Sequence, residues 1–343
     1  MHNCKQKIAL VTGAAGFIGF YISKLLLDEG WRVIGIDYMS DYYDVTLKEQ
    51  RECILLKNAS YRSIHENIAT SNILLGLFNE ERPDVVIHCA AQAGVRSSIE
   101  NPHAYLNSNI HGTFELLEAA RAYPPGHMVI ASSSSVYGAS KQLPYKEDDR
   151  ADHQISFYAA TKKATENIAH SYSHLYKLPI TMFRFFTVYG PWGRPDMALF
   201  KFTESIVNNE AIDVFNFGKM SRDFTYIDDL VHAIRLLLDA VPTDQLMSNE
   251  NMIWDKGKSS VAPFRVVNIG NSKPAKLLDF IVAIENSTGK KAIKNLIPMQ
   301  AGDVSATWAD VSVLERLTGY KPDTDIASGI DKFVAWYKEY YDM

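Results

Sequence analysis

The sequence of 343 residues is poor in cysteine, with only Cys4, Cys53 and Cys89. Three thiols at such wide spacing are too few for a disulfide framework or a metal cluster, so we expect no metal and a reducing, cytoplasmic setting. Long apolar runs are also missing, since no stretch approaches the roughly 20 residues of a membrane span. Residues 1–7 leave no room for the apolar core of a signal peptide. We therefore expect no contact with a membrane.

An excess of basic residues is missing as well. The chain has 35 Lys and Arg against 40 Asp and Glu, which gives a net charge of -5. Because no positive field is available to attract a polyanion, we expect no nucleic-acid partner. The remaining composition is ordinary for a globular protein, 47% hydrophobic and 22% charged, and the length suffices for one large or two smaller domains.

A glycine-rich turn stands between a predicted strand and a predicted helix near the N-terminus. The apolar run Lys7–Val11 leads into the turn Thr12-Gly-Ala-Ala-Gly-Phe-Ile-Gly19, and Phe20–Glu29 has helical periodicity. In this context the three glycines permit a tight turn, a close approach of pyrophosphate and close packing of the helix, in the order Gly13, Gly16 and Gly19. The phosphates would lie at the helix N-terminus. A glycine-rich turn without a ligand is the alternative.

An acidic residue follows the second predicted strand, Arg32–Ile36. Asp37 stands about 20 residues beyond the glycines, where a carboxylate holds the ribose hydroxyls of a dinucleotide. A carboxylate at this position repels a 2′-phosphate. The sequence therefore predicts NAD rather than NADP.

Short apolar strands alternate with helix-like segments over the first part of the chain, at residues 85–87, 128–130, 180–183 and 266–269. This alternation predicts an α/β fold, a doubly wound parallel sheet of the Rossmann type with helices on both faces. Ligands of such sheets lie beyond the carboxyl ends of the strands. Polar stretches follow the strands there: His88-Cys-Ala-Ala-Gln92, the serines at 132–135, and Arg184-Phe-Phe-Thr-Val-Tyr-Gly190.

The regular alternation ends near Pro191, which predicts a second, smaller mixed α/β domain for the substrate. We expect a strand within Asn208–Phe217, a helix over Asp228–Leu238 that returns to the first domain, and an amphipathic core helix over Ile326–Tyr341. The polar stretch Pro242–Pro263 is expected to form a surface loop. We assign residues 1–186, 226–240 and 263–271 to the NAD-binding domain, and residues 187–225, 241–262 and 272–343 to the substrate domain.

A tyrosine and a lysine stand four residues apart in Tyr158-Ala-Ala-Thr-Lys162, near the start of a predicted helix over Phe157–Tyr176. Residues at this spacing share one helix face. A nearby cation favours phenolate and lowers the tyrosine pKa from about 10, which suits a general base. The alternative is a packed aromatic ring beside a solvated charge. The serines at 132–135 could likewise satisfy their own loop, but opposite a Tyr-Lys pair we favour a hydroxyl that contacts the reacting group.

These stretches together resemble the extended short-chain dehydrogenase/reductase superfamily, and within it the nucleotide-sugar 4-epimerases, over nearly the entire chain. The stretch from Arg184 to Met197 is the most specific of them and is similar to the UDP-glucuronate 4-epimerases, a family associated with capsular polysaccharide biosynthesis. The resemblance is carried by Thr12-Gly-Ala-Ala-Gly-Phe-Ile-Gly19, Ala90-Ala-Gln-Ala-Gly-Val-Arg96, Ser132-Ser-Ser-Ser-Val-Tyr-Gly138, Tyr158-Ala-Ala-Thr-Lys162, Arg184-Phe-Phe-Thr-Val-Tyr-Gly-Pro-Trp-Gly-Arg-Pro-Asp-Met197 and Arg222-Asp-Phe-Thr-Tyr-Ile-Asp-Asp229.

The resemblance implies a role for each matching residue. Tyr158 matches the catalytic base, Lys162 the residue that lowers its pKa and binds the nicotinamide ribose, and Ser133 the third catalytic hydroxyl. The implied cofactor-binding residues are Gly13, Gly16, Phe17, Ile18, Gly19, Asp37, Asn67, Ile68, Ala90, Ala91 and Gln92. Arg96 is implied to bind the substrate. The sugar carboxylate is held by Ser134, Ser135, Thr187 and Arg194, and the UDP phosphate and ribose are bound by Arg222 and Asp303.

The implied activity is NAD-dependent inversion of carbon 4 of UDP-glucuronate to UDP-galacturonate through a transient 4-keto sugar. A homodimer is implied too, through helices at about 109–122 and 157–176. Ser134 and Ser135 stand where sugar 4,6-dehydratases carry Asp-Glu, which counts against a dehydratase. Ser135 also stands where UDP-glucuronate decarboxylases carry Glu, which counts against a decarboxylase. The remaining alternatives are a UDP-glucose, UDP-galactose or N-acetylhexosamine 4-epimerase and, from another class, a non-catalytic NAD-binding regulatory protein.

Some positions depart from the family pattern. Asn67 and Ile68 stand where relatives carry an aspartate that contacts adenine, although an amide oxygen can accept the same hydrogen bond. Ser97 replaces a common tyrosine, and Ala301 replaces a common proline. We expect these changes to loosen the contacts with the cofactor, the sugar and the uridine.

Overall fold

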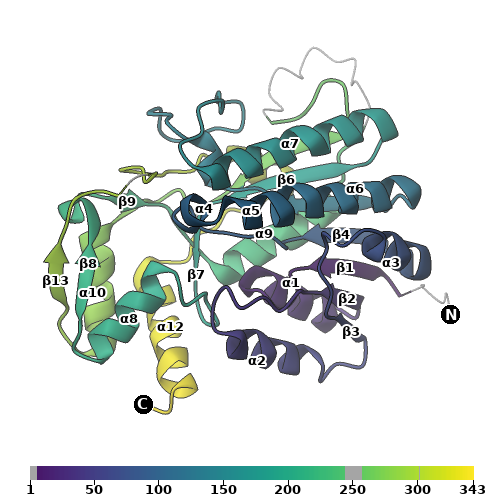
Figure 1. Ribbon diagram of the computed structural model, residues 1–343. Coiled ribbons are helices and arrows are strands. Elements are labelled where there is room, and N and C mark those ends of the chain that lie inside the picture. The colour runs from purple at the N-terminus through teal and green to yellow at the C-terminus, as the bar shows by residue number, and fades with distance from the viewer. Residues whose placement is uncertain (1–5, 244–256, 301) are drawn as a thin grey trace.

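The computed structural model describes residues 6–243, 257–300 and 302–343. Its centre is a seven-stranded sheet in the order β11-β6-β5-β4-β1-β2-β3, in which every neighbouring pair is parallel (Figure 1). The strands are β1 Ile8–Thr12, β2 Arg32–Ile36, β3 Tyr61–Ile64, β4 Val85–His88, β5 His127–Ala131, β6 Ile180–Phe185 and β11 Phe264–Ile269. The predicted α/β class with a parallel sheet is confirmed.

Helices cover both faces of this sheet. Successive side chains of a strand point to opposite faces, so Val33 of β2 belongs to one hydrophobic core and Ile34 to the other. Because both faces are buried, the inner strands are mostly apolar, and the polar residues within them, such as His88 of β4 and Arg184 of β6, are buried as well. One core includes residues of α1 Phe17–Asp28, α2 Val45–Leu55 and α9 Ile227–Asp239, and the other includes residues of α3 Ile73–Glu81, α6 Gly112–Ala122 and α7 Phe157–Tyr176.

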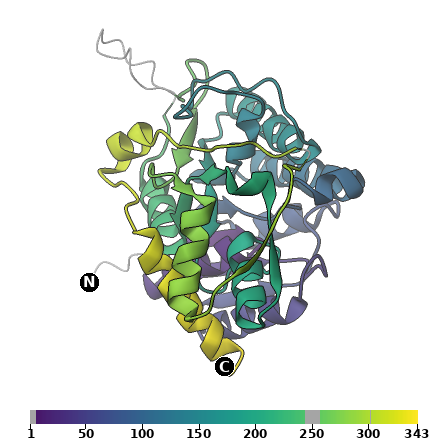
Figure 2. The same ribbon diagram turned by 90° about the vertical axis from the view of Figure 1, so that its left-hand side faces the viewer.

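A smaller α/β region lies beside the sheet, at the end where the strands terminate (Figures 1 and 2). Two short parallel strands, β8 Ala211–Val214 and β13 Ile293–Leu296, are its edge. Two further pairs complete it, β7 Thr187–Tyr189 with β10 Phe224–Tyr226, and β9 Ser221–Arg222 with β12 Ala275–Lys276. Its helices are α8 Ala198–Val207, α10 Leu277–Thr288 and α12 Ile326–Tyr340, whereas α11 Ser312–Thr318 packs against α9 and β11 of the main sheet.

The predicted elements of the second half are confirmed with small shifts. The strand expected within 208–217 is β8, and the helices expected at 228–238 and 326–341 are α9 and α12. Most of the predicted loop at 242–263 lies outside the described residues, which exclude 244–256. Ala301 lies outside the described residues as well. The exact domain boundaries stay a prediction.

The helix predicted at 109–122 is longer and irregular. It begins as α5 Pro102–Tyr105, passes through the π-helical turn η1 Leu106–His111, and ends as α6. The short helix α4 Ser97–Glu100 precedes it and is separated from it by the non-helical backbone of Asn101. Such π turns are rare and are often found at functional sites. In the part of the chain that the structure describes, no helix is long and apolar enough to cross a bilayer.

Candidate active site

One large cavity of about 1310 Å³ lies between the carboxyl ends of the strands and the smaller region. Every residue that the sequence analysis assigned to cofactor, catalysis or substrate lines this cavity. The β1–α1 turn and the segments that follow β2, β3 and β4 supply the residues assigned to the cofactor. Helix α7 and the segment after β5 supply the catalytic residues. The residues assigned to the substrate come from the segments after β4 and β5, from β7 and β9, and from the loops after β7 and β13.

The glycine-rich turn is packed too tightly for side chains. Gly13 has a positive φ of 71°, and a Cβ atom there would lie 2.7 Å from the backbone nitrogen of Ala90. A Cβ atom on Gly19 would lie 2.0 Å from the carbonyl oxygen of Gly13. Helix α1 begins at Phe17, and its N-cap Gly16 provides no side-chain cap. The first-turn N–H groups of α1 are therefore available to a phosphate, which is the arrangement that a dinucleotide pyrophosphate needs.

Asp37 closes the same turn from the end of β2. Its Oδ2 accepts a hydrogen bond from the backbone nitrogen of Ala15 at 3.1 Å, and its Oδ1 accepts one from Met39 at 2.9 Å. The ammonium of Lys48 on α2 lies 3.6 Å from Oδ1. Asp37 thus shapes the turn in addition to facing the cavity. Asn67 is engaged in a similar way, since its Oδ1 accepts a hydrogen bond from the backbone nitrogen of Ala69 at 2.9 Å.

Tyr158 and Lys162 both line the cavity from α7, as their spacing on one helix face predicts. The ammonium of Lys162 donates to the carbonyl oxygen of Ala131 at 2.9 Å. Burial raises the pKa of Tyr158, and the opposing influences come from a hydrogen bond with Ser133 and from the charge of Arg194. Burial also lowers the pKa of the Lys162 ammonium to about 8. The lowered pKa that was predicted for Tyr158 is therefore not found, because burial outweighs the influences that lower it. The catalytic roles of Tyr158 and Lys162 stay a prediction.

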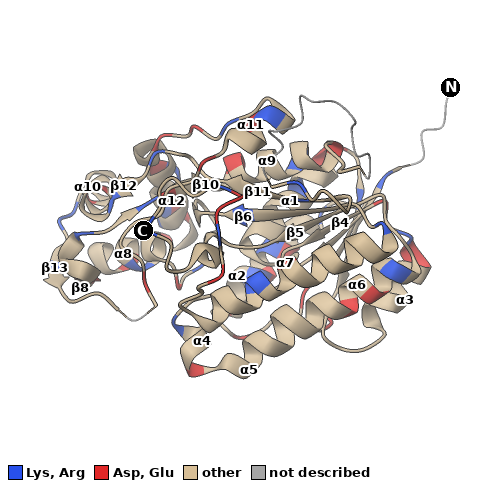
Figure 3. Ribbon diagram, turned by 90° about the horizontal axis from the view of Figure 1, so that it is seen from above, with Lys and Arg blue, Asp and Glu red and all other residues tan. Residues whose placement is uncertain are grey.

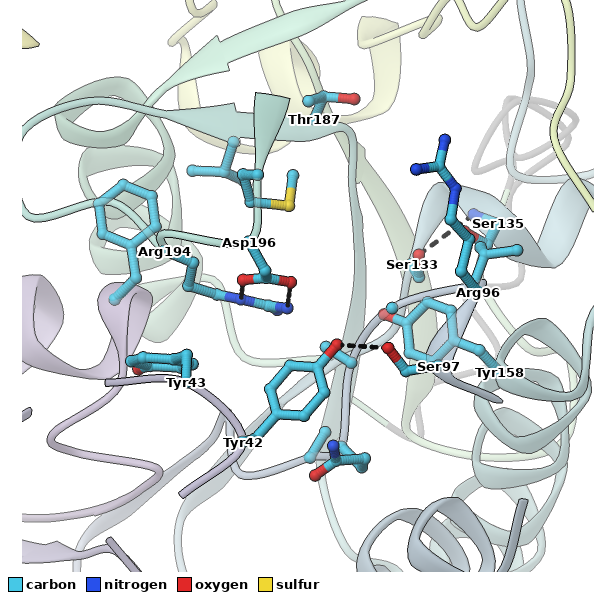
Figure 4. Close-up of a pocket in the computed structure, with 18 of the residues that line it drawn as sticks. Tyr42, Tyr43, Arg96, Ser97, Ser133, Ser135, Tyr158, Thr187, Arg194 and Asp196 are labelled. Carbon is cyan, nitrogen blue, oxygen red and sulfur yellow. Dashed lines mark hydrogen bonds and ion pairs between the residues drawn. The ribbon is translucent and has the colours of Figure 1, made fainter. Parts of the chain in front are cut away.

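The serine stretch serves its own loop and the site at once. The Ser133 hydroxyl accepts a hydrogen bond from the backbone nitrogen of Ser135 at 3.1 Å, which caps the short helix η2 Ser134–Tyr137 (Figure 4). The same side chain contacts Tyr158. Ser132 points away from both and donates to Glu166 at 2.6 Å. The interpretation that these serines satisfy their own loop is therefore confirmed for Ser133, and the contact of a serine hydroxyl with the reacting group stays a prediction.

A buried ion pair that was not predicted from the sequence joins α7 to β6. Glu166 binds Arg184 of β6 through two contacts of 2.8 Å each. Burial alone would raise the pKa of Glu166. The pKa is nevertheless lowered to about 2 by the charges of Arg184 and Lys163 and by the hydrogen bonds from Arg184 and the Ser132 hydroxyl. An arginine inside an otherwise apolar strand was the available signal, because a buried charge needs a partner.

Arg194 carries a carboxylate partner of its own. Its Nε lies 3.0 Å from Oδ1 of Asp196 and its Nη2 lies 2.6 Å from Oδ2, so the two side chains form a two-point ion pair inside the cavity (Figure 4). The guanidinium also lies 5.7 Å from the centre of the Tyr42 ring. The motif that contains Arg194 was noted in the sequence, but no role was assigned to Asp196 or Tyr42.

Arg96, Arg222 and Asp303 come from different segments of the chain and lie close together in the wall of the cavity. The guanidinium of Arg96 lies 4.4 Å from the centre of the Phe215 ring and 3.5 Å from Asp303. Burial lowers the pKa of Arg222, and the charge of Asp303 opposes this effect. Ser97 accepts or donates a hydrogen bond of 2.9 Å with the Tyr42 hydroxyl (Figure 4). The structure thus brings together Arg96, Arg222 and Asp303.

Asn109 of the π-helical turn was also missed. Its Nδ2 donates to the carbonyl oxygen of Gln92 at 3.1 Å and to Thr161 at 3.0 Å, and its Oδ1 accepts from the backbone nitrogen of Gln92. Thr161 in turn donates to the carbonyl oxygen of Tyr158 at 2.8 Å. Asn109 therefore joins the segment after β4 to the helix that carries Tyr158. A buried amide in a helical stretch was the only signal in the sequence.

Known proteins share this arrangement. The chain is 49% identical over 332 residues to the "Probable UDP-glucuronate 4-epimerase" of Rhizobium meliloti (strain 1021), covering 97% of each. It is 50% identical over 338 residues to protein CapI of Staphylococcus aureus, covering 97% of this chain and 98% of that protein. The crystal structure of UDP-glucuronic acid 4-epimerase from Bacillus cereus in complex with UDP-glucuronic acid and NAD superposes with a TM-score of 0.86 at 33% identity, covering 97% of this chain and 100% of that one.

A family model extends this likeness from single proteins to a family. Residues 9–248 match the model of the NAD dependent epimerase/dehydratase family. These residues contain the glycine-rich turn, Tyr158, Lys162 and Arg194, which line the cavity together. The chain belongs to the NAD dependent epimerase/dehydratase family.

Proposed function

We propose that this protein inverts carbon 4 of UDP-glucuronate to give UDP-galacturonate, using a bound NAD that is regenerated in each cycle. The observation that carries the proposal is the shared cavity, which is lined by Tyr158 and Ser133 together with the glycine-rich turn and Arg194. Relatives that match 97% of the chain carry the name UDP-glucuronate 4-epimerase, which supports the same activity.

NAD fits the residues on one side of this cavity. The open first turn of α1 and the crowded glycines would hold the pyrophosphate, Asp37 would hold the adenosine ribose, and Lys162 would hold the nicotinamide ribose. The proposed remaining contacts come from Phe17, Ile18, Asn67, Ile68, Ala90, Ala91 and Gln92. NAD, when bound, supplies the redox chemistry by taking hydride from carbon 4 and returning it to the opposite face.

Tyr158 would act as the base that removes the proton of the sugar 4-hydroxyl. Burial raises its pKa, so the phenolate must be stabilised by its neighbours, and the Ser133 hydrogen bond and the Arg194 charge both act in that direction. Lys162, with a pKa near 8, carries a positive charge over much of the neutral range. The 4-keto sugar formed in this step would turn within the cavity before Tyr158 returns the proton.

Arg194, Ser134, Ser135 and Thr187 would bind the carboxylate of the sugar. The oxidised intermediate is a β-keto acid, which loses carbon dioxide readily. Hydrogen bonds and an opposite charge keep the carboxylate ionised and hold it in an orientation that disfavours this loss. Arg96, Arg222 and Asp303 would bind the UDP moiety on the other side of the cavity.

The ion pair between Arg194 and Asp196 favours a second candidate, a 4-epimerase of a neutral UDP-hexose. A guanidinium whose charge is already balanced attracts a second carboxylate less strongly. The two candidates are separated by incubating the enzyme with UDP-glucuronate, UDP-glucose and UDP-N-acetylglucosamine and identifying the products by NMR.

We expect UDP-galacturonate to be formed with the highest kcat/KM and without net change in absorbance near 340 nm. Faster conversion of UDP-glucose would favour the second candidate. UDP-4-ketopentose as the main product would contradict epimerisation, and lack of turnover with all three substrates would favour a regulatory NAD-binding protein.

A homodimer and a cytoplasmic location belong to the same proposal. Apolar side chains are exposed along η1, α6 and α7, at Leu106, Phe114, Phe157 and Leu175. Figure 3 shows α6 and α7 side by side, and α5 packs against α7. Contact between copies of this face would bury these side chains and would bring the helix that carries Tyr158 to the interface.

A further inference from the structure

Arg51 of helix α2 is fully buried and connects two distant segments of the cavity wall. Its side chain is 0% exposed. Nη1 donates to the carbonyl oxygen of Ala15 in the glycine-rich turn at 3.0 Å and to the Tyr43 hydroxyl at 2.9 Å. Nη2 donates to the carbonyl oxygen of Trp192 at 2.6 Å, with Gly193 further away at 3.4 Å. One guanidinium therefore bridges the turn assigned to the pyrophosphate and the loop that carries Arg194.

The partners of this cation are unusual. Buried arginines are normally paired with a carboxylate, because an uncompensated charge in the interior is costly. Within residues 6–243, 257–300 and 302–343, Arg51 binds carbonyl and phenol oxygens, forms no ion pair, and leaves its Nε without a hydrogen bond. An apolar side chain would fill this space at lower electrostatic cost. What an apolar side chain cannot do is donate to two backbone segments at once, which is the property of a planar guanidinium fork.

The loop from 190 to 197 needs such a restraint. Trp192 has a positive φ of 58°, a backbone conformation that residues with bulky side chains rarely adopt. Its ring packs against Phe20, Trp336 and Tyr340, with centroids 5.3–6.0 Å apart. Arg51 holds the carbonyl group of the same residue, and Arg194 follows two residues later. The position of the Arg194 side chain is therefore set by a loop that Arg51 fastens to α2 and to the glycine-rich turn.

We infer that Arg51 is a positioning residue, which fixes the Arg194 loop relative to the glycine-rich turn so that the sugar carboxylate and the cofactor are held in register. This inference rests on the proposed function, because it assumes that Arg194 meets a carboxylate. Its effect on binding should accordingly be specific to ligands that carry one.

The test uses the NAD-loaded enzyme with Tyr158→Phe to stop turnover, and compares the Kd of UDP-glucuronate with that of UDP by calorimetry. We expect Arg51→Met to raise the Kd of UDP-glucuronate about tenfold and to leave the Kd of UDP within about twofold. In an Arg194→Met background, Arg51→Met should add less than about twofold, because the two residues act through one contact. Equal weakening of UDP, or additive losses in the double variant, would overturn the inference.

Two further variants separate positioning from general stability. Arg51→Lys keeps the charge but presents one compact ammonium, so we expect about a threefold loss for UDP-glucuronate. Full affinity in this variant would overturn the need for a fork and with it the inference. Gln50→Met, at an exposed neighbouring position of α2, is the matched control and should leave both Kd values unchanged.

Hydrogen exchange distinguishes failure of this inference from failure of the proposed function. The backbone amides of residues 190–197 should exchange faster in Arg51→Met than in the parent, whichever sugar the enzyme accepts. Unchanged exchange there would overturn the positioning role. If exchange increases but the parent binds UDP-glucuronate no better than UDP-glucose, the proposed function is wrong and the restraint of the loop still holds.

Discussion

Arg194 and Asp196 form an ion pair within the cavity, with contacts of 3.0 and 2.6 Å between the guanidinium and both carboxylate oxygens. A substrate carboxylate would have to share or displace Asp196. Asp196→Asn keeps an oxygen acceptor for Arg194 and removes the negative charge. We therefore expect this variant to bind UDP-glucuronate about threefold to tenfold more tightly, with the Kd of UDP unchanged. Calorimetry at two salt concentrations measures the effect, and weaker binding would show that Asp196 orients Arg194 instead of competing for it.

Tyr158 is the residue on which turnover depends in the proposed mechanism. Tyr158→Phe removes the hydroxyl and keeps the ring, so we expect kcat to fall by about 10²–10⁴ with the NAD content and the thermal stability preserved. Tyr176→Phe changes an exposed tyrosine of the same helix and should have no effect on kcat. Activity of the Tyr158 variant within tenfold of the parent would contradict its role as the base.

Arg194 is expected to protect the intermediate as well as to bind the substrate. Arg194→Met removes the charge that keeps the carboxylate ionised and oriented, so the KM for UDP-glucuronate should rise about tenfold or more. The product mixture should shift towards UDP-4-ketopentose, which NMR quantifies. An unchanged product ratio would mean that other groups restrain the carboxylate.

The sheet and the residues of the cavity were predictable because they depend on local patterns. Glycine spacing, residues just after strand ends and the Tyr-Lys spacing are properties of short stretches of sequence, and they singled out Gly13, Asp37 and Tyr158, which line one cavity. Arg222 lines the same cavity but was found only through the family resemblance. Strand β3 was missed because it lies at the sheet edge, where only Tyr61 is buried and no continuous apolar run is required.

What could not be predicted depends on contacts between distant residues. Nothing local in the sequence reveals that Arg51 meets Trp192, which lies 141 positions away, or that Asn109 meets Gln92 and Thr161. The pKa of Tyr158 was predicted from its spacing to Lys162, but it is set by burial, which only the fold determines. Charge partners four residues apart are therefore a weaker guide to ionisation than the depth of the site.

The apolar face of α6 and α7 provides a direct test of the proposed dimer. Phe114→Glu places a charge among the exposed apolar side chains of this face, and burial of that charge at an interface would be unfavourable. We expect light scattering to show a dimer for the parent and a monomer for this variant. Val282→Glu, at an exposed position of α10 in the smaller region, is the control and should stay dimeric. A monomeric parent would contradict the proposed homodimer.

Glu147 makes a separate prediction about pH and stability. Its side chain is 6% exposed, and its Oε1 accepts a hydrogen bond from the backbone nitrogen of Asn268 at 2.8 Å. Burial raises the pKa of Glu147 from 4.5 to about 7. Between these values the folded protein binds more protons than the unfolded chain, so stability falls as the pH rises. The contribution of protonated Glu147 is complete below pH 4.5 and is lost as the pH passes 7.

Glu147→Gln imitates the protonated side chain and keeps the acceptor for Asn268. Relative to the parent, we expect the variant to be of similar stability near pH 4.5 and more stable by up to about 3 kcal/mol near pH 8, which corresponds to a pKa shift of 2.5. Urea unfolding at several pH values measures this difference. Glu49→Gln, at an exposed position, should show no such dependence. A difference in unfolding free energy between Glu147→Gln and the parent that stays constant over this range would contradict the prediction. It would mean that Glu147 has the same pKa in the folded protein and in the unfolded chain, because stability depends on pH only where the two states bind different numbers of protons.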